Sequence, residues 1–257
     1  MDLAHTPESA TVSATEADAG AGMSAIERMA AIFLRPAAAW GGLRERAQWW
    51  IPLLLVLIVT LGGTALLYSR AILPDMLSGM EERVAGGEMS AEQLQRIEEF
   101  YRGPAGIGMT LGTGAIAMPV ITFFVALLVW FAVGFVLGAP FRYRLALEVT
   151  CWSSLVTLPP AVLTYVTAWI QESMRTVHTG FGILMPEAAP GDRLVRALTV
   201  FLDWIGPFGV WHVVVAVLGA AYLSGAPRRS VAWALGVLYV VSGLCAAGLA
   251  ALLPAGG

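Results

Sequence analysis

Polar side chains and a proline recur along one side of an apolar segment, residues 145–171. They follow one another at steps of three and four residues, which places them on one side of an α-helix. Lipid tails offer hydroxyl groups no hydrogen-bond partner, so we predict that this side faces protein or water. These residues, which we call the polar stripe, are Thr150, Ser153, Thr157, Pro160, Thr164, Thr167 and Gln171.

Two adjacent prolines, Pro159 and Pro160, interrupt the same helix near its middle. They remove the backbone donors that would bond the carbonyls of Leu155 and Val156, and their rings bend the helix. Two interpretations of this bent, polar helix are open. The hydroxyls hold neighbouring helices together, or the bent helix lines a ligand site or a water-filled path, as broken helices do in transporters.

His212 is the ionisable residue in the middle of a second apolar segment, residues 200–223. A neutral imidazole donates one hydrogen bond and accepts another, so we expect it to pair with hydroxyls such as those of Thr157 or Thr164. An ionisable group inside a membrane also suggests a functional site. A single histidine without further ligands favours packing, and no spacing in the chain suits a metal.

Other residues have spacings that predict helix contacts or an ion pair. Arg144 and Glu148 are four residues apart at the start of the apolar segment 145–171, which predicts a local ion pair at the inner membrane interface. Small residues let helices approach closely. The candidates for helix contacts are Gly134 and Gly138 in a GxxxG pattern, and Gly209, Ala216 and Gly219 on the side of His212.

The composition indicates that these residues lie in a membrane protein. Hydrophobic residues make up 58% of the 257 residues, and charged residues only 13%, about half their usual share in soluble domains. We predict an all-α, polytopic membrane protein with a single five-span domain over residues 50–257. The expected spans are 50–68, 117–138, 145–171, 200–223 and 231–253. Residues 103–116 are rich in glycine, and interfacial and re-entrant placements remain open for them.

The segments outside the spans also contain sequence patterns that predict their structure. Residues 1–22 are polar and without apolar period, so we expect a disordered tail. Residues 23–49 predict an amphipathic interfacial segment that opens with a helix capped by Ser24 and Glu27. A second capping box at Ser90 and Gln93 predicts a short helical hairpin between the first two spans, on the extracytoplasmic side.

Charge distribution predicts the orientation of the chain. The two shortest connections between expected spans carry arginines, whereas residues 70–102 hold seven acidic residues against four arginines. The N-terminus is therefore expected in the cytoplasm and the C-terminus outside, in a bacterial inner membrane. Because every basic residue is arginine, chemistry that needs a lysine Schiff base or a P-loop is excluded. We expect no cofactor and no nucleic-acid partner.

Several short motifs resemble the YIP family of five-span, Ypt/Rab-interacting membrane proteins, in its prokaryotic branch. The resemblance covers residues 24–253 and is carried by IFLRPAAAW, WWIP, MSAEQLQRIEEF, SSLVTLPP and VWHVVVAVLGAAYLSG. It implies five spans, a cytosolic N-terminus and, in eukaryotes, a role in vesicle traffic with small GTPases. The short tail of this chain argues against GTPase binding, and the resemblance implies no active-site residues.

We therefore expect a non-enzymatic integral membrane protein that organises membranes or binds partners through helix contacts. Its expected partners are the lipid bilayer and other membrane proteins or a second copy of the chain. The alternative is a small-molecule or ion transporter or channel lined by the polar stripe and His212. Serine, histidine and aspartate occur without an arrangement that activates a nucleophile, which argues against an enzyme.

Overall fold

A computed structural model describes residues 22–174, 177–186 and 192–252, and within these ranges every regular element is helical. This confirms the all-α class. The disordered tail that we predict for residues 1–22 lies outside the described residues, apart from Gly22. Five helical stretches are long and apolar enough to cross a membrane, as expected: Trp50–Ala85, Pro104–Val136, Tyr143–Gln171, Pro207–Ser224 and Arg228–Leu252.

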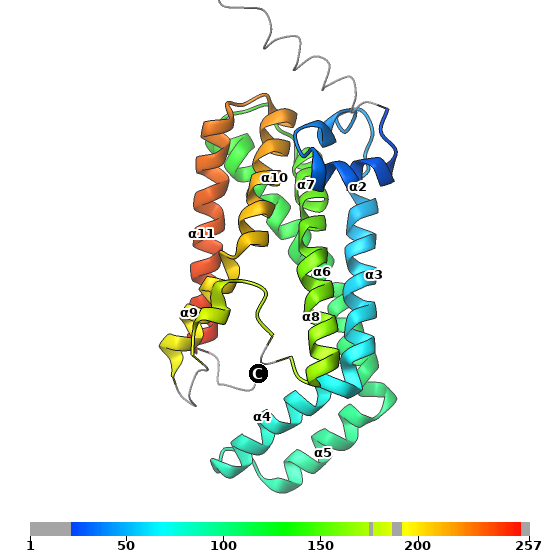
Figure 1. Ribbon diagram of the computed structural model, residues 1–257, viewed down its shortest axis with the longest axis vertical. Helices are drawn as coiled ribbons and strands as arrows, with labels where there is room; N and C mark the ends of the chain where they lie inside the picture. Colours follow the sequence, from blue (N-terminus) through cyan, green and yellow to red (C-terminus); the bar gives the residue numbers. More distant parts are fainter. Residues whose placement is uncertain (1–21, 175–176, 187–191, 253–257) are drawn as a thin grey trace, which may run out of the picture. The chain divides into compact units, whose positions relative to one another are not determined.

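The helices follow the chain in an order that Figure 1 shows. The longer elements are α3 (Trp50–Leu67), α6 (Pro104–Trp130), α7 (Tyr143–Ser153), α8 (Leu158–Gln171), α10 (Pro207–Ser224) and α11 (Arg228–Leu252). The shorter α-helices are α2 (Ala25–Leu34), α4 (Leu73–Ala85), α5 (Ala91–Arg102) and α9 (Arg193–Trp204). Short 3₁₀ turns cover Ala38–Trp40, Ser154–Thr157 and Phe181–Leu184, and π-helical turns cover Tyr68–Ile72 and Phe131–Val136.

Local sequence signals fix several helix ends. In α2, the Ser24 hydroxyl accepts from the Glu27 amide, and the Glu27 carboxylate accepts from the Ser24 amide. Ser90 and Gln93 form the same reciprocal cap on α5. Both capping boxes satisfy amide groups that the first helical turn leaves without partners.

The hairpin of α4 and α5 builds a small core of its own. Tyr68, Leu73 and Leu77 are buried there, and Leu94 and Tyr101 of α5 pack against them. The Tyr68 hydroxyl donates to the Tyr101 carbonyl over 2.8 Å. The apolar side of α5 thus covers this core.

Helix α6 begins at Pro104, so the glycine-rich residues 104–116 belong to the same continuous helix as the rest of the second span. Proline suits the first turn of a helix, where its missing amide has no partner to bond. The helix has 27 residues, about 40 Å at 1.5 Å per residue. It therefore exceeds a hydrocarbon layer of roughly 30 Å and must tilt or extend beyond it.

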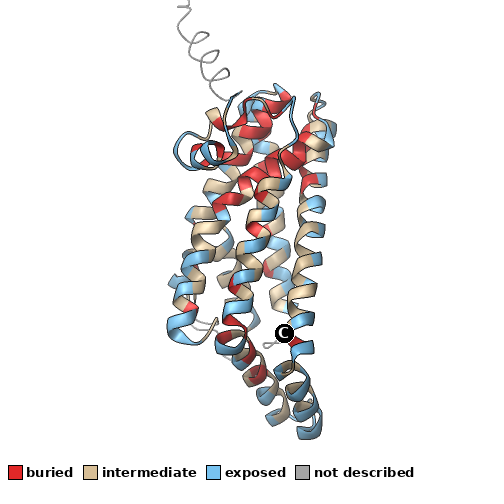
Figure 2. Ribbon diagram, turned by 90° about the vertical axis from the view of Figure 1, so that its right-hand side faces the viewer, coloured by how far each residue is buried: buried red, intermediate tan, exposed pale blue. Residues whose placement is uncertain are grey.

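The chain divides into two compact units. Unit 1 comprises residues 1–54, 122–156 and 211–238, and unit 2 comprises residues 55–121, 157–210 and 239–257. Most buried residues, red in Figure 2, belong to unit 1. Among the described residues, those that are both buried and polar or charged all lie in unit 1: Arg28, Glu148, Thr150, Ser153 and Ser224.

Candidate functional site

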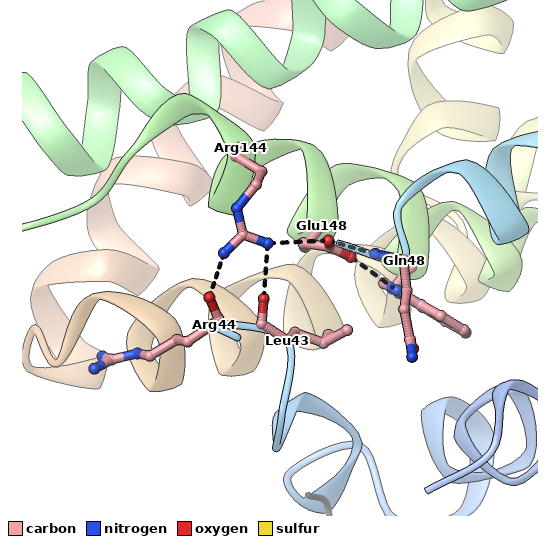
Figure 3. A network of polar contacts seen from close by, with 6 residues as sticks. Leu43, Arg44, Gln48, Arg144 and Glu148 are labelled. Atoms are coloured by element: carbon pink, nitrogen blue, oxygen red, sulfur yellow. Dashed lines mark hydrogen bonds and ion pairs between the residues drawn. The ribbon is translucent and has the colours of Figure 1, made fainter. Parts of the chain in front are cut away.

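Glu148 is the centre of a buried network in unit 1, shown in Figure 3. It lies on α7 and is fully buried. Its Oε1 accepts from the backbone amide of Gln48 over 2.8 Å, and its Oε2 accepts from the indole Nε1 of Trp152 over 3.2 Å. Two donors satisfy the carboxylate, which a charge removed from water requires.

Arg144 connects Glu148 to the segment that follows α2. Its Nη1 lies 3.6 Å from Glu148 Oε1, so the two residues four apart form an ion pair. The same guanidinium donates to the carbonyls of Leu43, over 3.0 Å, and of Arg44. A planar guanidinium has five donors, which lets one side chain bond several acceptors at once.

Arg44 continues the network toward α10. Its Nη2 donates to the carbonyls of Leu223, over 2.8 Å, and of Tyr222, over 3.3 Å. These carbonyls belong to the last turn of α10, where helix geometry leaves carbonyl groups without partners and the macrodipole favours a cation. Arg44 thus stabilises the end of α10 and attaches residues 41–46 to it.

Arg28 is the buried charge of α2, with 2% of its surface exposed. Its Nη1 donates to the Ala39 carbonyl, and its guanidinium lies 5.6 Å from the ring centre of Trp152. Burial lowers the pKa of Arg28, and the carboxylate of Glu148 opposes this shift. Arginine titrates so far above neutrality that the side chain stays charged.

Trp40 joins the same segment to α10 by packing. The residue is fully buried, and its ring lies so close to Gly219 that a Cβ there would come within 2.5 Å of it. Glycine at position 219 therefore provides the space that the indole occupies. In unit 1 Gly219 contacts this tryptophan of the 3₁₀ turn Ala38–Trp40, and its predicted contact with another long helix stays a prediction.

We call Arg28, Arg44, Arg144 and Glu148 the arginine–glutamate cluster. Each member bonds to backbone groups of residues 39–48 or α10, or to another member. The charges therefore hold the N-terminal segment on α7 and α10. From the sequence, only the contact between Arg144 and Glu148 is predicted. For Arg28 a signal exists, because it shares one helix side with the buried Ala31 and Ile32.

The polar stripe divides where the helix changes its geometry. Helix α7 ends at Ser153, a 3₁₀ turn covers residues 154–157, and α8 starts at Leu158. Pro159 and Pro160 thus lie in the first turn of a new helix, where a missing amide has no partner to lose. The hydroxyls of Ser153 and Ser154 donate to the carbonyls of Thr150 and Cys151.

Burial differs along the stripe. In unit 1, Thr150 and Ser153 are buried, and the Thr150 hydroxyl is without a hydrogen-bond partner among the described residues. In unit 2, Thr157 is exposed, whereas Thr164 and Thr167 are half-buried. The exposed large side chains of α8 are apolar, and most of them lie on the side of the helix opposite to the stripe: Val162, Leu163, Val166, Trp169 and Ile170.

His212 lies on α10 in unit 1, and its Nδ1 is 3.1 Å from the carbonyl oxygen of Ser153. We expected a hydroxyl of the polar stripe as its partner. A carbonyl can only accept, so Nδ1 carries the hydrogen and the neutral ring keeps Nε2 as an acceptor. The histidine thus bonds the backbone just before the 3₁₀ turn, where the regular helical pattern ends.

Replacing His212 with alanine is expected to destabilise the detergent-solubilised protein by about 1 kcal/mol, because the Ser153 carbonyl loses its donor. His212→Asn places an amide NH₂ near the position of Nδ1 and should restore part of the loss. His212→Gln, whose amide reaches the position of Nε2, should restore less. Thermal unfolding monitored by circular dichroism measures the order, and equal stability of all four proteins would remove a structural role for this bond.

The remaining glycines proposed for helix contacts have different surroundings. A Cβ at Gly134 would lie 2.9 Å from the Phe141 carbonyl, and Gly138 has a φ of 64° in the turn after the π-helical residues. Their local role is thus in the turn that follows α6, and a helix contact through them stays a prediction. Gly209 makes room for the Tyr239 hydroxyl of α11, which donates to the Trp204 carbonyl. Ala216 is buried on α10.

A second GxxxG pair, Gly108 and Gly112 on α6, was not singled out from the sequence. A Cβ at either position would meet no other described atom within 4 Å, so the surface above both glycines is open. Met109 and Ile116 lie on the same side and are 55% and 70% exposed. The pattern lies in the glycine-rich run GPAGIGMTLGTG, for which the sequence leaves an interfacial and a re-entrant placement open.

Five apolar helical spans, with the arginine–glutamate cluster of unit 1 bonded to the backbone of that unit, define a polytopic α-helical membrane protein. Residues 30–250 match the Yip1 domain. The chain therefore belongs to the Yip1 family, which confirms the resemblance seen in the motifs. No curated protein and no solved structure matches the chain.

Proposed function

We propose that this Yip1-family protein is a non-enzymatic membrane subunit that organises or binds other membrane proteins through contacts between transmembrane helices. The observation that carries the proposal is the open surface at Gly108 and Gly112 of α6. Small residues four apart let a second helix approach closely, and packing of this kind drives helix association in lipid. The occupant is a transmembrane helix of a second copy or of another membrane protein.

The arginine–glutamate cluster of unit 1 also supports the proposal, because its charges have a structural role. A transporter or an enzyme keeps charged groups available for its substrate. Here the charges bond to backbone carbonyls and amides of unit 1 instead. This use of charge stabilises a fixed arrangement of the N-terminal segment, with α2 as the interfacial helix that the sequence predicts, on the cytoplasmic side of a bacterial inner membrane.

A transporter or channel is the second candidate function. It is favoured by the buried Thr150 hydroxyl, which has no hydrogen-bond partner in the part of the chain that the structure describes, and by the helix break at residues 154–157. A buried polar atom of this kind is costly unless water reaches it. In this reading the path follows Thr157 and Thr164 of α8.

Single cysteines in a background without Cys151 and Cys245 separate the two functions. Helix association predicts that a cysteine at Ile116, in native membranes, forms a cross-linked protein adduct, whereas one at the lipid-facing Val162 does not. It also predicts that cysteines at Thr157 and Thr164 stay unlabelled by a membrane-impermeant thiol reagent, because no aqueous path reaches them. The mass of the adduct distinguishes a second copy from another protein.

Gly112→Leu supplies the matched variant for this experiment. A bulky side chain on the open surface should abolish the adduct at position 116 and leave the expression level unchanged. Labelling at both threonine positions together with no adduct at position 116 would favour the transporter and overturn the proposal of helix association.

A further inference from the structure

A groove of about 400 Å³ runs between α10 and α11 within unit 1. Its apolar lining comes mainly from one side of α10, through Val213, Val214, Val217 and Leu218, with Ala232 from α11. The volume lies in the range of sites for small molecules and single lipid chains. Both helices are long and apolar enough to span a membrane, so the apolar lining suits the hydrocarbon layer.

Two arginines close one end of the groove. Arg228 and Arg229 are the first two residues of α11, and both are exposed. Within the part of the chain that the structure describes, neither has an ion-pair or hydrogen-bond partner. They differ in this respect from Arg28, Arg44 and Arg144, whose guanidinium groups bond to backbone carbonyls.

The position of the arginines along the spans corresponds to the lipid headgroups. They follow the three-residue turn between α10 and α11, at the start of a span. Trp233, 69% exposed, lies one turn further along α11, and tryptophan is enriched at the interface of membranes. From the end of α10 at Ser224 back to Val213 the groove descends about 16 Å, which equals about half of the hydrocarbon layer.

We propose that this groove binds an anionic phospholipid, with its phosphate on Arg228 and Arg229 and one acyl chain along Val213, Val217 and Leu218. Guanidinium groups bind phosphate oxygens bidentately, and amide groups of the first turn of α11 point toward the same anion. An apolar lining ending in two free cations is complementary to a ligand that has an acyl chain and a negative headgroup in one molecule.

The test measures lipid binding to the full-length protein in detergent by native mass spectrometry. Phosphatidylglycerol and phosphatidylcholine with the same acyl chains are titrated separately. One phosphatidylglycerol is expected to bind roughly tenfold more tightly than phosphatidylcholine, since each cation near anionic lipid contributes on the order of a few-fold in affinity. Equal affinities for the two lipids would overturn the proposal.

Two double variants that remove the same amount of charge show whether the preference for phosphatidylglycerol depends on Arg228 and Arg229. Arg228→Gln with Arg229→Gln should abolish the preference for phosphatidylglycerol. Arg46→Gln with Arg142→Gln removes two exposed arginines of the same unit and should keep the preference. Loss of the preference in both double variants would mean that the lipid responds to the general surface charge, which would overturn a specific site.

A variant of the lining distinguishes a lipid from a soluble phosphate. Ala232→Trp fills the groove and should weaken phosphatidylglycerol binding about tenfold, and Val214→Gln, which makes the lining polar, serves if the first variant does not fold. Glycerol phosphate is expected neither to bind nor to compete. Competition by glycerol phosphate at lipid-like concentrations, or unchanged lipid binding in the folded lining variant, would overturn the phospholipid assignment.

Discussion

Replacing Glu148 with alanine is expected to lower the free energy of unfolding by about 3 kcal/mol, the lower end of the cost of breaking a buried ion pair. The carboxylate is fully buried and accepts from the Gln48 amide and the Trp152 indole. Without it, both donors lose their acceptor. The side chain of Arg144 is 36% exposed, so water compensates part of its loss, which is why we expect the lower end.

Glu148→Gln tests how much of the loss in unfolding free energy is due to the missing charge. The amide oxygen can still accept one of the two hydrogen bonds, but the NH₂ group cannot accept the other, so about half of the destabilisation should remain. Chemical unfolding in detergent gives the two values. The control is Glu45→Ala on an exposed side chain of the same segment, which should change stability by less than about 0.5 kcal/mol.

Hydrogen exchange identifies where the protein loosens in the Glu148 variants. The Gln48 amide bonds to Glu148, and Arg144 bonds to the carbonyls of Leu43 and Arg44. Peptides covering residues 41–49 should therefore exchange faster in Glu148→Ala than in Glu45→Ala. If both variants exchange and unfold alike, the arginine–glutamate cluster does not hold this segment.

The elements that the sequence predicts well are those encoded locally. Apolar length gives the five spans, and two reciprocal capping boxes mark the starts of α2 and α5. The doubled proline correctly indicates a break in the third span. Each of these features depends on one continuous stretch of the chain, a span of apolar residues or the few residues of a cap or a proline pair, so the sequence pattern contains the physical cause.

The network around Glu148 could not be predicted because most of its acceptors are backbone carbonyls. Every residue has a carbonyl, so nothing in the sequence marks Leu43 or Leu223 as a partner of an arginine about 100 or 180 positions away. Only the i,i+4 spacing of Arg144 and Glu148 is visible beforehand. The same limit applies to His212, whose partner is a carbonyl and not the hydroxyls that its polarity suggests.

The spacing of glycines shows a different limit of prediction from the sequence. Gly134 and Gly138 match a GxxxG pattern, yet one lies against the following turn and the other has a positive φ. Gly108 and Gly112 match the same pattern on an uninterrupted helix and leave an open surface. The pattern alone does not distinguish a turn from a contact surface, because that depends on where the helix ends.

The second large effect is expected at Gly219. Its added Cβ in Gly219→Ala would lie 2.5 Å from the ring of Trp40, which is fully buried. Overpacking a rigid contact costs about 1 to 3 kcal/mol, and the higher helix propensity of alanine recovers less than 1 kcal/mol. We therefore expect a net destabilisation of about 2 kcal/mol in chemical unfolding.

The same substitution at Gly236 of α11 is the matched control, because a Cβ there meets no other described atom within 4 Å. Gly236→Ala should stabilise the protein by several tenths of a kcal/mol, opposite in sign to Gly219→Ala. Trp40→Ala alone should cost about 3 kcal/mol or more, as expected for a large side chain removed from a core.

The double variant Trp40→Ala with Gly219→Ala decides whether the tryptophan causes the effect. Once the indole is absent, the Cβ at position 219 occupies free space, so Gly219→Ala should become neutral or slightly stabilising in the Trp40→Ala background. The coupling between the two positions is then about 2 kcal/mol. If the cost of Gly219→Ala is the same in both backgrounds, the indole is not what the glycine accommodates, and the attachment of residues 38–40 to α10 must depend on other contacts.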